Sequence, residues 1–171
     1  MSNRNVCIAV VANHAQAEKA LAVLRDGHFD MQQVSLVGKD HPEDKSIHGY
    51  YTTGQNMKFW GEQGALWGGL MGALAGAGFL FVPGIGPLVV AGPLLSMIVG
   101  GAQGAVALGG IEAVFAGLLH LGLTRDSLVL YESQLKAGKI LVVAHGLPAD
   151  VTSALSLLTN AGFAPVTVHA A

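Results

Sequence analysis

The sequence of 171 residues contains little charge and almost no cysteine. Asp, Glu, Lys and Arg make up 12% of the residues, against about 25% in a typical soluble domain. A net charge of -2 without a long basic run argues against nucleic acid as a partner. Cys7 is the single cysteine, which excludes an internal disulfide and suits a reducing compartment. The first residues lack a signal-peptide core, which predicts a cytoplasmic start.

Charge is scarcest in the middle of the chain. Residues 64–123 contain one charged side chain, Glu112, and 16 of the 24 glycines. The flanking segments carry the other charged residues, so the middle and the flanks are predicted to form different kinds of structure.

The two flanking segments share one pattern, which predicts a β-α-β unit in each. The first has strands at 5–12 and 33–37, and the apolar face of the helix between them is Ala17, Ala20, Leu21 and Leu24. The second has strands at 139–144 and 166–168, and its helix carries Val151, Ala154, Leu155 and Leu158 on one face. Gly27 is predicted to end the first helix in the left-handed conformation that glycine adopts without strain.

Two such units predict a four-stranded antiparallel sheet with two helices on one face. This is the ferredoxin-like α+β sandwich, built from residues 1–40 and 139–171. Residues 41–57 are predicted to be a polar linker. Residues 124–138 are predicted to be an amphipathic connecting helix, which is capped by Thr124 and buries Leu128, Tyr131 and Leu135.

Residues 58–123 predict an inserted glycine-zipper helical hairpin. Glycines spaced four residues apart let helices approach closely, and the predicted packing residues are Gly64, Gly68, Gly72, Gly76, Gly100 and Gly104. Helical arms are predicted at 65–82 and 94–111. Because proline and glycine interrupt helices, the turn between the arms is predicted at Pro83, Gly84, Gly86 and Pro87.

Each arm has 18 uncharged residues, close to the roughly 20 that span a bilayer. Lys58 and Arg125 flank the pair on the side of the folded domain, which is the positive-inside arrangement. We therefore expect a hairpin in the inner membrane, with the folded domain on its cytoplasmic side and with lipid and further copies of the chain as partners. The alternative is a soluble cytoplasmic assembly whose hairpins form an apolar core.

Few residues suggest a chemical site. Glu112 and His120 are candidates for buried ionisable residues, because a carboxylate in an apolar helix is expensive to bury. The alternative is that Glu112 marks the end of the apolar span. No nucleophile and base occur in a recognised motif, and the histidines lack metal-ligand spacing, so neither an enzyme, a metal nor another cofactor is predicted. Cys7 is expected to be a small core residue.

Several segments carry a resemblance along nearly the whole chain. They are Phe29–Asp40, Gly49–Gly54, Trp60–Gly61, Val82–Pro87, Ala91–Pro93 and Tyr131–Glu132. In this order they resemble a bacterial family described as general stress proteins, low-temperature-induced-like proteins or glycine-zipper membrane proteins of unknown function. The resemblance implies a stress-linked, non-enzymatic protein with a glycine-zipper hairpin, and it assigns no catalytic or binding residue.

The predicted function is a structural or protective role at the membrane under stress, through self-association of the hairpin. Two alternatives stay open. One is a soluble homo-oligomer with an apolar chamber that carries a lipid or quinone-like molecule. The other is a small-metabolite-binding regulatory domain, by analogy of fold.

Overall fold

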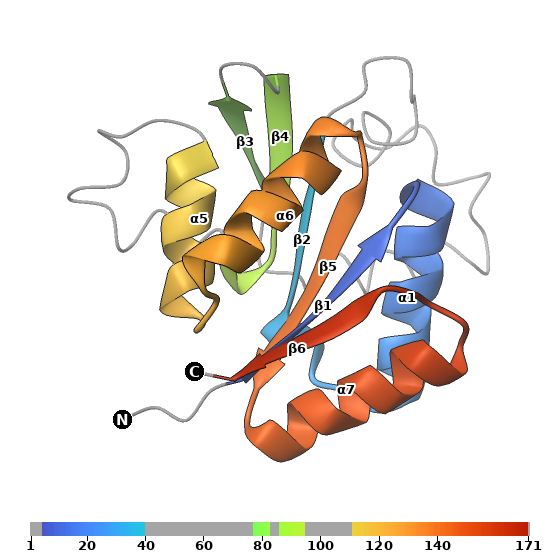
Figure 1. Cartoon of the computed structure of the whole chain (residues 1–171). Coiled ribbons are helices and arrows are strands. Elements are labelled where there is room, and N and C mark those ends of the chain that lie inside the picture. The colour runs from blue at the N-terminus through green and yellow to red at the C-terminus, as the bar shows by residue number, and fades with distance from the viewer. Residues whose placement is uncertain (1–4, 40–76, 83–85, 95–110, 171) are drawn as a thin grey trace.

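The computed structural model describes residues 5–39, 77–82, 86–94 and 111–170. The fold is α+β, as the sequence predicts: helices pack against one antiparallel sheet (Figure 1). Six strands are described, in the spatial order β3-β4-β2-β5-β1-β6. The predicted polar linker at 41–57 lies outside the described residues.

Each flanking segment forms the predicted β-α-β unit. The first consists of β1 (Asn5–Val11), α1 (His14–Asp26), the short 3-10 helix η1 (Met31–Gln33) and β2 (Val34–Lys39). The second consists of β5 (Ile140–Gly146), α7 (Pro148–Asn160) and β6 (Val166–Ala170). The apolar faces predicted for α1 and α7 are buried, except that Leu155 of α7 is only partly so.

The two units are interleaved in the sheet. β1 and β5 are neighbours and pair antiparallel, with Val6 opposite His145 and Val10 opposite Leu141. β6 pairs with the other side of β1, and β2 pairs with the other side of β5. Each unit therefore has its two strands separated by a strand of the other unit, which joins the two ends of the chain in one sheet.

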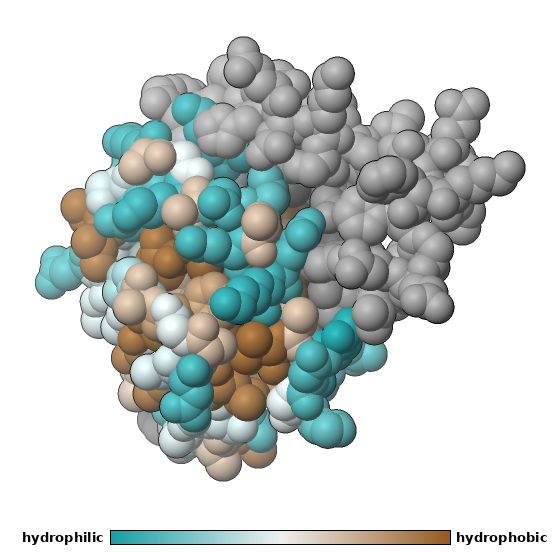
Figure 2. Space-filling model, turned by 90° about the vertical axis from the view of Figure 1, so that its right-hand side faces the viewer, coloured by the Kyte–Doolittle hydropathy of each residue, from teal (hydrophilic) through white to brown (hydrophobic). Residues whose placement is uncertain are grey.

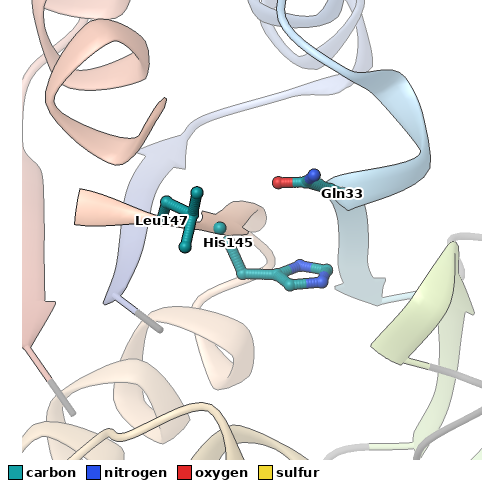
Figure 3. A pocket seen from close by; sticks show the side chains of 4 residues that line it. Gln33, His145 and Leu147 are labelled. Atoms are coloured by element: carbon teal, nitrogen blue, oxygen red, sulfur yellow. The ribbon is translucent and has the colours of Figure 1, made fainter. Parts of the chain in front are cut away.

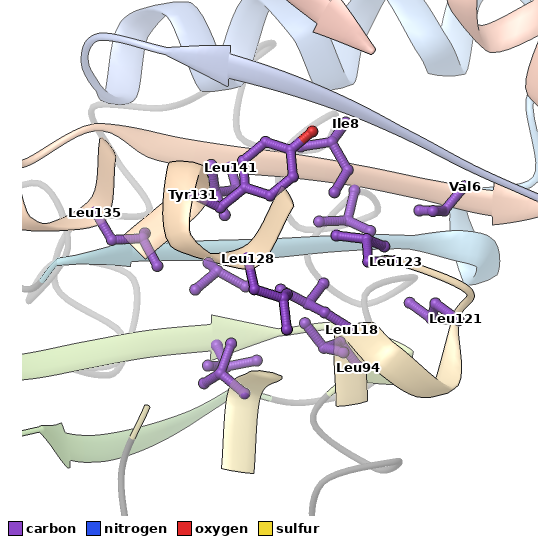
Figure 4. Packing of buried hydrophobic residues seen from close by; sticks show 14 of the residues in the cluster. Val6, Ile8, Leu94, Leu118, Leu121, Leu123, Leu128, Tyr131, Leu135 and Leu141 are labelled. Atoms are coloured by element: carbon purple, nitrogen blue, oxygen red, sulfur yellow. The ribbon is translucent and has the colours of Figure 1, made fainter. Parts of the chain in front are cut away.

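The sheet is covered on both faces, whereas the sequence predicted helices on one. Side chains of α1 and α7 pack on the first face, against Cys7, Ala9, Val11, Val34, Ile140, Val142 and Ala144. On the second face lie α5 (Ile111–His120) and α6 (Arg125–Lys136). Figure 4 shows the packing there, where Leu118 of α5 and Leu128, Tyr131 and Leu135 of α6 meet Ile8 and Leu141. The three α6 residues are the ones predicted to be buried, and Thr124 caps this helix as expected.

The described parts of the glycine-rich segment do not form the predicted helical hairpin. β3 (Ala77–Val82) and β4 (Gly86–Ala91) are antiparallel strands, and β4 also pairs with β2. The helix predicted over 65–82 is therefore wrong for residues 77–82, and Gly86 and Pro87 lie in a strand rather than a turn. Aromatic and β-branched residues, as in the Phe-Leu-Phe-Val run that ends β3, favour strands, and the edge of β2 offers backbone groups that only a strand can pair.

The helix α5 shows that the end of the glycine-rich segment also belongs to the folded domain. Its residues Val114 and Leu118 are fully buried in the core cluster on the second face, followed by Leu121. Among the described residues, none of the helices has both the length and the hydropathy that a membrane crossing requires.

Gly27 ends α1 as its C-cap, as predicted, but without the predicted left-handed conformation. Gly27 has φ -77°, and the left-handed residue is His28 with φ 61°. A Cβ on Gly27 would lie 2.6 Å from Cδ2 of Leu157 in α7. Glycine therefore allows the two helices to approach closely here, while the left-handed conformation is adopted one residue later.

The surface of the described part mixes polar and apolar side chains. On the face seen in Figure 2, hydrophilic residues lie between apolar ones. The exposed large hydrophobic side chains of the described part include Leu119, Val129, Leu130, Leu147 and Val168. Val129 and Leu130 lie on the outer side of α6, whereas Leu147 directly precedes α7 and Val168 lies in β6.

Candidate functional site

A pocket of about 210 Å³ lies where β5 ends and η1 leads into β2. Gln33, His145, Gly146 and Leu147 line it. Figure 3 shows Gln33 and Leu147 on opposite sides, with His145 between them. Pockets for drug-sized ligands begin at about 300 Å³, so this one suits a smaller molecule.

The polar groups of the pocket wall are withdrawn from water. The side chain of His145 is 6% exposed. The carboxamide nitrogen of Gln33 donates to Oδ2 of Asp30 at 3.3 Å. Its carboxamide oxygen is buried and accepts no hydrogen bond from any described residue. An unsatisfied buried acceptor costs about 1–3 kcal/mol, so a donor brought by a bound molecule would be stabilised there.

Gly146 allows several oxygen acceptors to gather. A Cβ on this residue would overlap Oε1 of Gln33 and would lie 3.3 Å from Oδ2 of Asp150. Asn5 of β1 lies directly opposite Gly146 of β5. The side-chain oxygen of Asn5 is also buried and has no hydrogen-bond partner among the described residues. These oxygens accept hydrogen bonds, so the arrangement selects ligands that donate them, such as amines and amides.

The start of α7 is already occupied by a carboxylate. The backbone N–H of Leu147 donates to Oδ2 of Asp150 at 3.2 Å. Pro148 has no N–H, and the N–H of Val151 donates to the carbonyl of Leu147 at 3.1 Å. The Asp150 carboxylate therefore offsets the partial positive charge of the helix N-terminus, and the site favours a hydrogen-bond donor over an anion.

A second polar pair lies between α6 and β6. The hydroxyl of Tyr131 is 2.8 Å from Nε2 of His169, and the two rings meet edge to face with their centroids 5.8 Å apart. The side chain of Tyr131 is 2% exposed. Burial raises the pKa of Tyr131, although a hydrogen bond with Thr167 acts in the opposite direction. Burial also lowers the pKa of His169.

We expect the fold to lose stability when His169 is protonated. Burial lowers its pKa below the ordinary value of 6.5, so the unfolded chain binds a proton at higher pH than the folded chain. The stabilisation is complete above pH 6.5 and is lost as the pH falls from there to the lower folded pKa. Thermal unfolding followed from about pH 7.5 to about pH 5 covers this range. His169→Gln should show a smaller decrease, and equal decreases would exclude His169 as the cause.

Cys7 is a core residue, as predicted. It is fully buried in β1, and burial raises the pKa of its thiol to about 11. The thiol is therefore protonated at neutral pH, which leaves it a poor nucleophile.

The structure brings few of the predicted site residues together. The packing glycines Gly64, Gly68, Gly72, Gly76, Gly100 and Gly104 lie outside the described residues, as do Pro83 and Gly84. Glu112 is in the first turn of α5, and its side chain is not among those that the structure describes. His120 ends α5, and its side chain is exposed in the single chain, so any burial of this histidine would need lipid or a second copy. His120 comes two residues after Leu118, which faces the core, and therefore lies on the outer side of the helix.

The residues around the pocket were not singled out from the sequence. Gln33 and Asn5 lie far apart along the chain from Gly146 and meet it only through the pairing of β1 and β2 with β5. The local signal was the sequence His145-Gly-Leu-Pro148, in which a polar residue and a glycine stand between a buried strand and a helix. In the part of the chain that the structure describes, no group of three or more His, Cys, Asp or Glu residues could hold a metal ion.

Comparisons of the chain with protein-family models, with curated proteins and with solved structures give no match. The functional interpretation therefore depends on the residues of this chain and their geometry.

Proposed function

We propose that this protein is non-enzymatic and that its folded domain binds a small metabolite that carries an amine or amide N–H. The binding site is the pocket lined by Gln33, His145, Gly146 and Leu147. One observation carries this proposal: the buried carboxamide oxygen of Gln33 has no hydrogen-bond partner among the described residues. A ligand N–H would donate a hydrogen bond to this oxygen. Such a hydrogen bond is stronger in a buried site than in water.

The surroundings of this oxygen support the same class of ligand. The Asp150 carboxylate beside Gly146 favours a positively charged amine over an anion. Leu147 is 63% exposed at the pocket, so its side chain can cover the apolar part of a bound molecule. The ligand is therefore a small molecule with a donor group at one end and an apolar portion at the other.

We also propose that β2, β5, β1 and β6, with α1 and α7, form a ferredoxin-like unit. The antiparallel order β2-β5-β1-β6 and the interleaved β-α-β units support this assignment. In such a unit the pocket lies at one end of the central strands. A regulatory role for metabolite binding rests on this analogy of fold.

Titration of the isotope-labelled full chain tests the binding, with amide resonances recorded by NMR. Isobutylamine and propionamide serve as probes that join a hydrogen-bond donor to an apolar portion, and acetate serves as the anionic comparison. We expect the two donors to shift the resonances of residues 145–147 and acetate to leave them unchanged. Gln33→Ala should weaken donor binding about tenfold, since one buried hydrogen bond is lost.

The control is Gln32→Ala, because Gln32 is the exposed neighbour in the same short helix. It should bind the probes as the unchanged protein does. Equal binding by the two variants, binding of acetate in preference to the two donors, or no response to any probe would each contradict the proposal.

The glycine-rich residues support a second candidate function. The four-residue spacing of Gly64, Gly68, Gly72 and Gly76 favours close helix packing, which supports self-association through this segment. The resemblance to glycine-zipper stress proteins supports a stress-linked role on the cytoplasmic side of the inner membrane. Carbonate extraction of membranes would test the membrane association. Because β3 and β4 pair within the folded sheet, this role rests on residues before Ala77 and after Leu94.

A further inference from the structure

β6 forms one edge of the sheet that the structure describes, and its own sequence lacks the charged residues and prolines that protect many edge strands. It pairs with β1 on one side, and no described strand pairs with its other side. Thr167, Val168 and Ala170 are exposed. Natural proteins block such edges with Lys, Pro or a bulge, because unpaired backbone groups recruit another strand. The strand Val-Thr-Val-His-Ala has no charged residue and no proline.

The sequence of β6 is complementary to itself when two copies run antiparallel about Val168. Val168 then lies opposite Val168 of the second copy, Val166 opposite Ala170, and Thr167 opposite His169. Val166, Val168 and Ala170 form an apolar row on the face of α7, because Val166 packs in the α1–α7 cluster and side chains alternate along a strand. Thr167 and His169 form a polar row on the face of α6, where His169 meets Tyr131.

This register is favoured over those shifted by one residue. A shift of one residue would place Val168 opposite Thr167 and would put α6 of one copy on the same side as α7 of the other. In the register about Val168, the Cβ atom of His169 lies about 5 Å from the Cβ atom of Thr167 in the second copy. The hydrogen bond between the Tyr131 hydroxyl and Nε2 of His169 already orients this imidazole on the α6 face.

Charge does not oppose the approach of a second copy. The helix α7 packs beside β6, and Asp150 is its single charged residue. On the face of α7, two copies that meet along β6 therefore bring few like charges together. On the other face, α6 carries two charges of each sign, on Arg125, Asp126, Glu132 and Lys136. A two-fold dimer is the commonest closed assembly of identical chains, and a self-complementary strand satisfies its symmetry.

We propose that two copies of this chain pair antiparallel through β6, about a two-fold axis at Val168, so that their sheets join into one. This interface lies apart from the glycine-rich segment and from the pocket at Gln33, and it does not depend on ligand binding.

Cysteine cross-linking of the full chain tests the register. In the proposed dimer, Val168→Cys places two thiols on directly opposite residues, whose Cα atoms lie about 4.5–5.5 Å apart and within disulfide range. Ala170→Cys is the matched control on the same strand, since its two copies are offset by four residues, about 13 Å. We expect an oxidised covalent dimer from Val168→Cys and a monomer from Ala170→Cys on a gel without reductant. Cross-linking of both to the same extent would overturn the proposal.

Light scattering after size-exclusion chromatography tests the association itself. The unchanged protein should have an even number of copies, and Val168→Lys should halve the mass because a charged edge cannot pair. Val129→Lys is the control, since Val129 is 67% exposed on the outer side of α6. A monomeric unchanged protein, or a Val168→Lys variant of undiminished mass, would refute the dimer. If Val168→Lys does not fold, the two cysteine variants still decide the question.

Discussion

Gly92→Ala is expected to destabilise the fold by about 3 kcal/mol or more, through backbone strain and overlap together. Gly92 follows β4 with φ +89°, a conformation that costs alanine about 1–2 kcal/mol. A Cβ there would also overlap the carbonyl oxygen of Val34 and lie 2.9 Å from Cα of Ser35. Both contacts are with the backbone of β2, which cannot move aside as the end of a side chain can.

The turn at Gly92 also holds a buried hydrogen bond in place. The N–H of Leu94 donates to Oγ of Ser35 at 3.0 Å, and both residues are fully buried. If alanine pushes the turn away from β2, this bond is broken or lengthened inside the core. A buried donor left without its acceptor adds about 1–3 kcal/mol to the cost.

Gly162→Ala is the matched control for this change. Gly162 has nearly the same conformation, with φ +87°, but a Cβ there would have no atom within 4 Å. Its substitution should therefore cost only the strain of the left-handed backbone, about 1–2 kcal/mol. The two free energies of unfolding can be compared by urea denaturation of the full chain. If both variants lose the same stability, the close approach of Gly92 to β2 has no energetic consequence.

The sequence predicts the two β-α-β units well because their information is local. In α1 and α7, apolar residues recur at helical spacing between short apolar strands, and the same plan occurs twice. The order of the strands is not local. Nothing in the run Asn5–Val11 shows that β5 will lie on one side of β1 and β6 on the other.

The glycine-rich segment shows how a local pattern can be overridden. Regular glycine spacing predicts helices through residue 82, but residues 77–82 are a strand. The edge of β2 is available after β5 has paired with its other side, and β4 occupies it with Leu88 and Val90 on the core face. β3 pairs with β4, which is nearby in the sequence, and β4 in turn pairs with the distant β2. The pairing that adds this hairpin to the sheet is therefore made through β4, and no window around residue 80 contains β2.

The candidate site could be predicted only in part, for the same reason. Gly146 stands between a strand and a helix and could have been identified as a point of close approach. Gln33 and Asn5 become neighbours of Gly146 only through the sheet. Gly27 shows both cases: its position after the helix predicts the C-cap that it forms, whereas its close contact with Leu157 in another helix is not visible in the sequence.

Leu88→Ala is expected to destabilise the domain by about 2–5 kcal/mol, as is usual when a buried leucine is truncated. Leu88 is fully buried in the core cluster of the second face, together with Val37 of β2 and Leu118 of α5. A helical hairpin that left the domain would expose this position to lipid or to another chain, and truncation would then leave the unfolding of the domain unchanged.

Unfolding in urea, followed by far-ultraviolet circular dichroism, measures this loss. Val129→Ala is the control, because its side chain is two-thirds exposed and its truncation should change stability by no more than about 0.5 kcal/mol. A large loss for Leu88→Ala alone means that β4 is part of the cooperative core, which confines any membrane-inserted or self-associating helix to the glycine-rich residues on either side of β3 and β4. Equal, small losses would mean that β4 contributes nothing to the core, and the helical hairpin predicted from the glycine spacing would again account for residues 77–91.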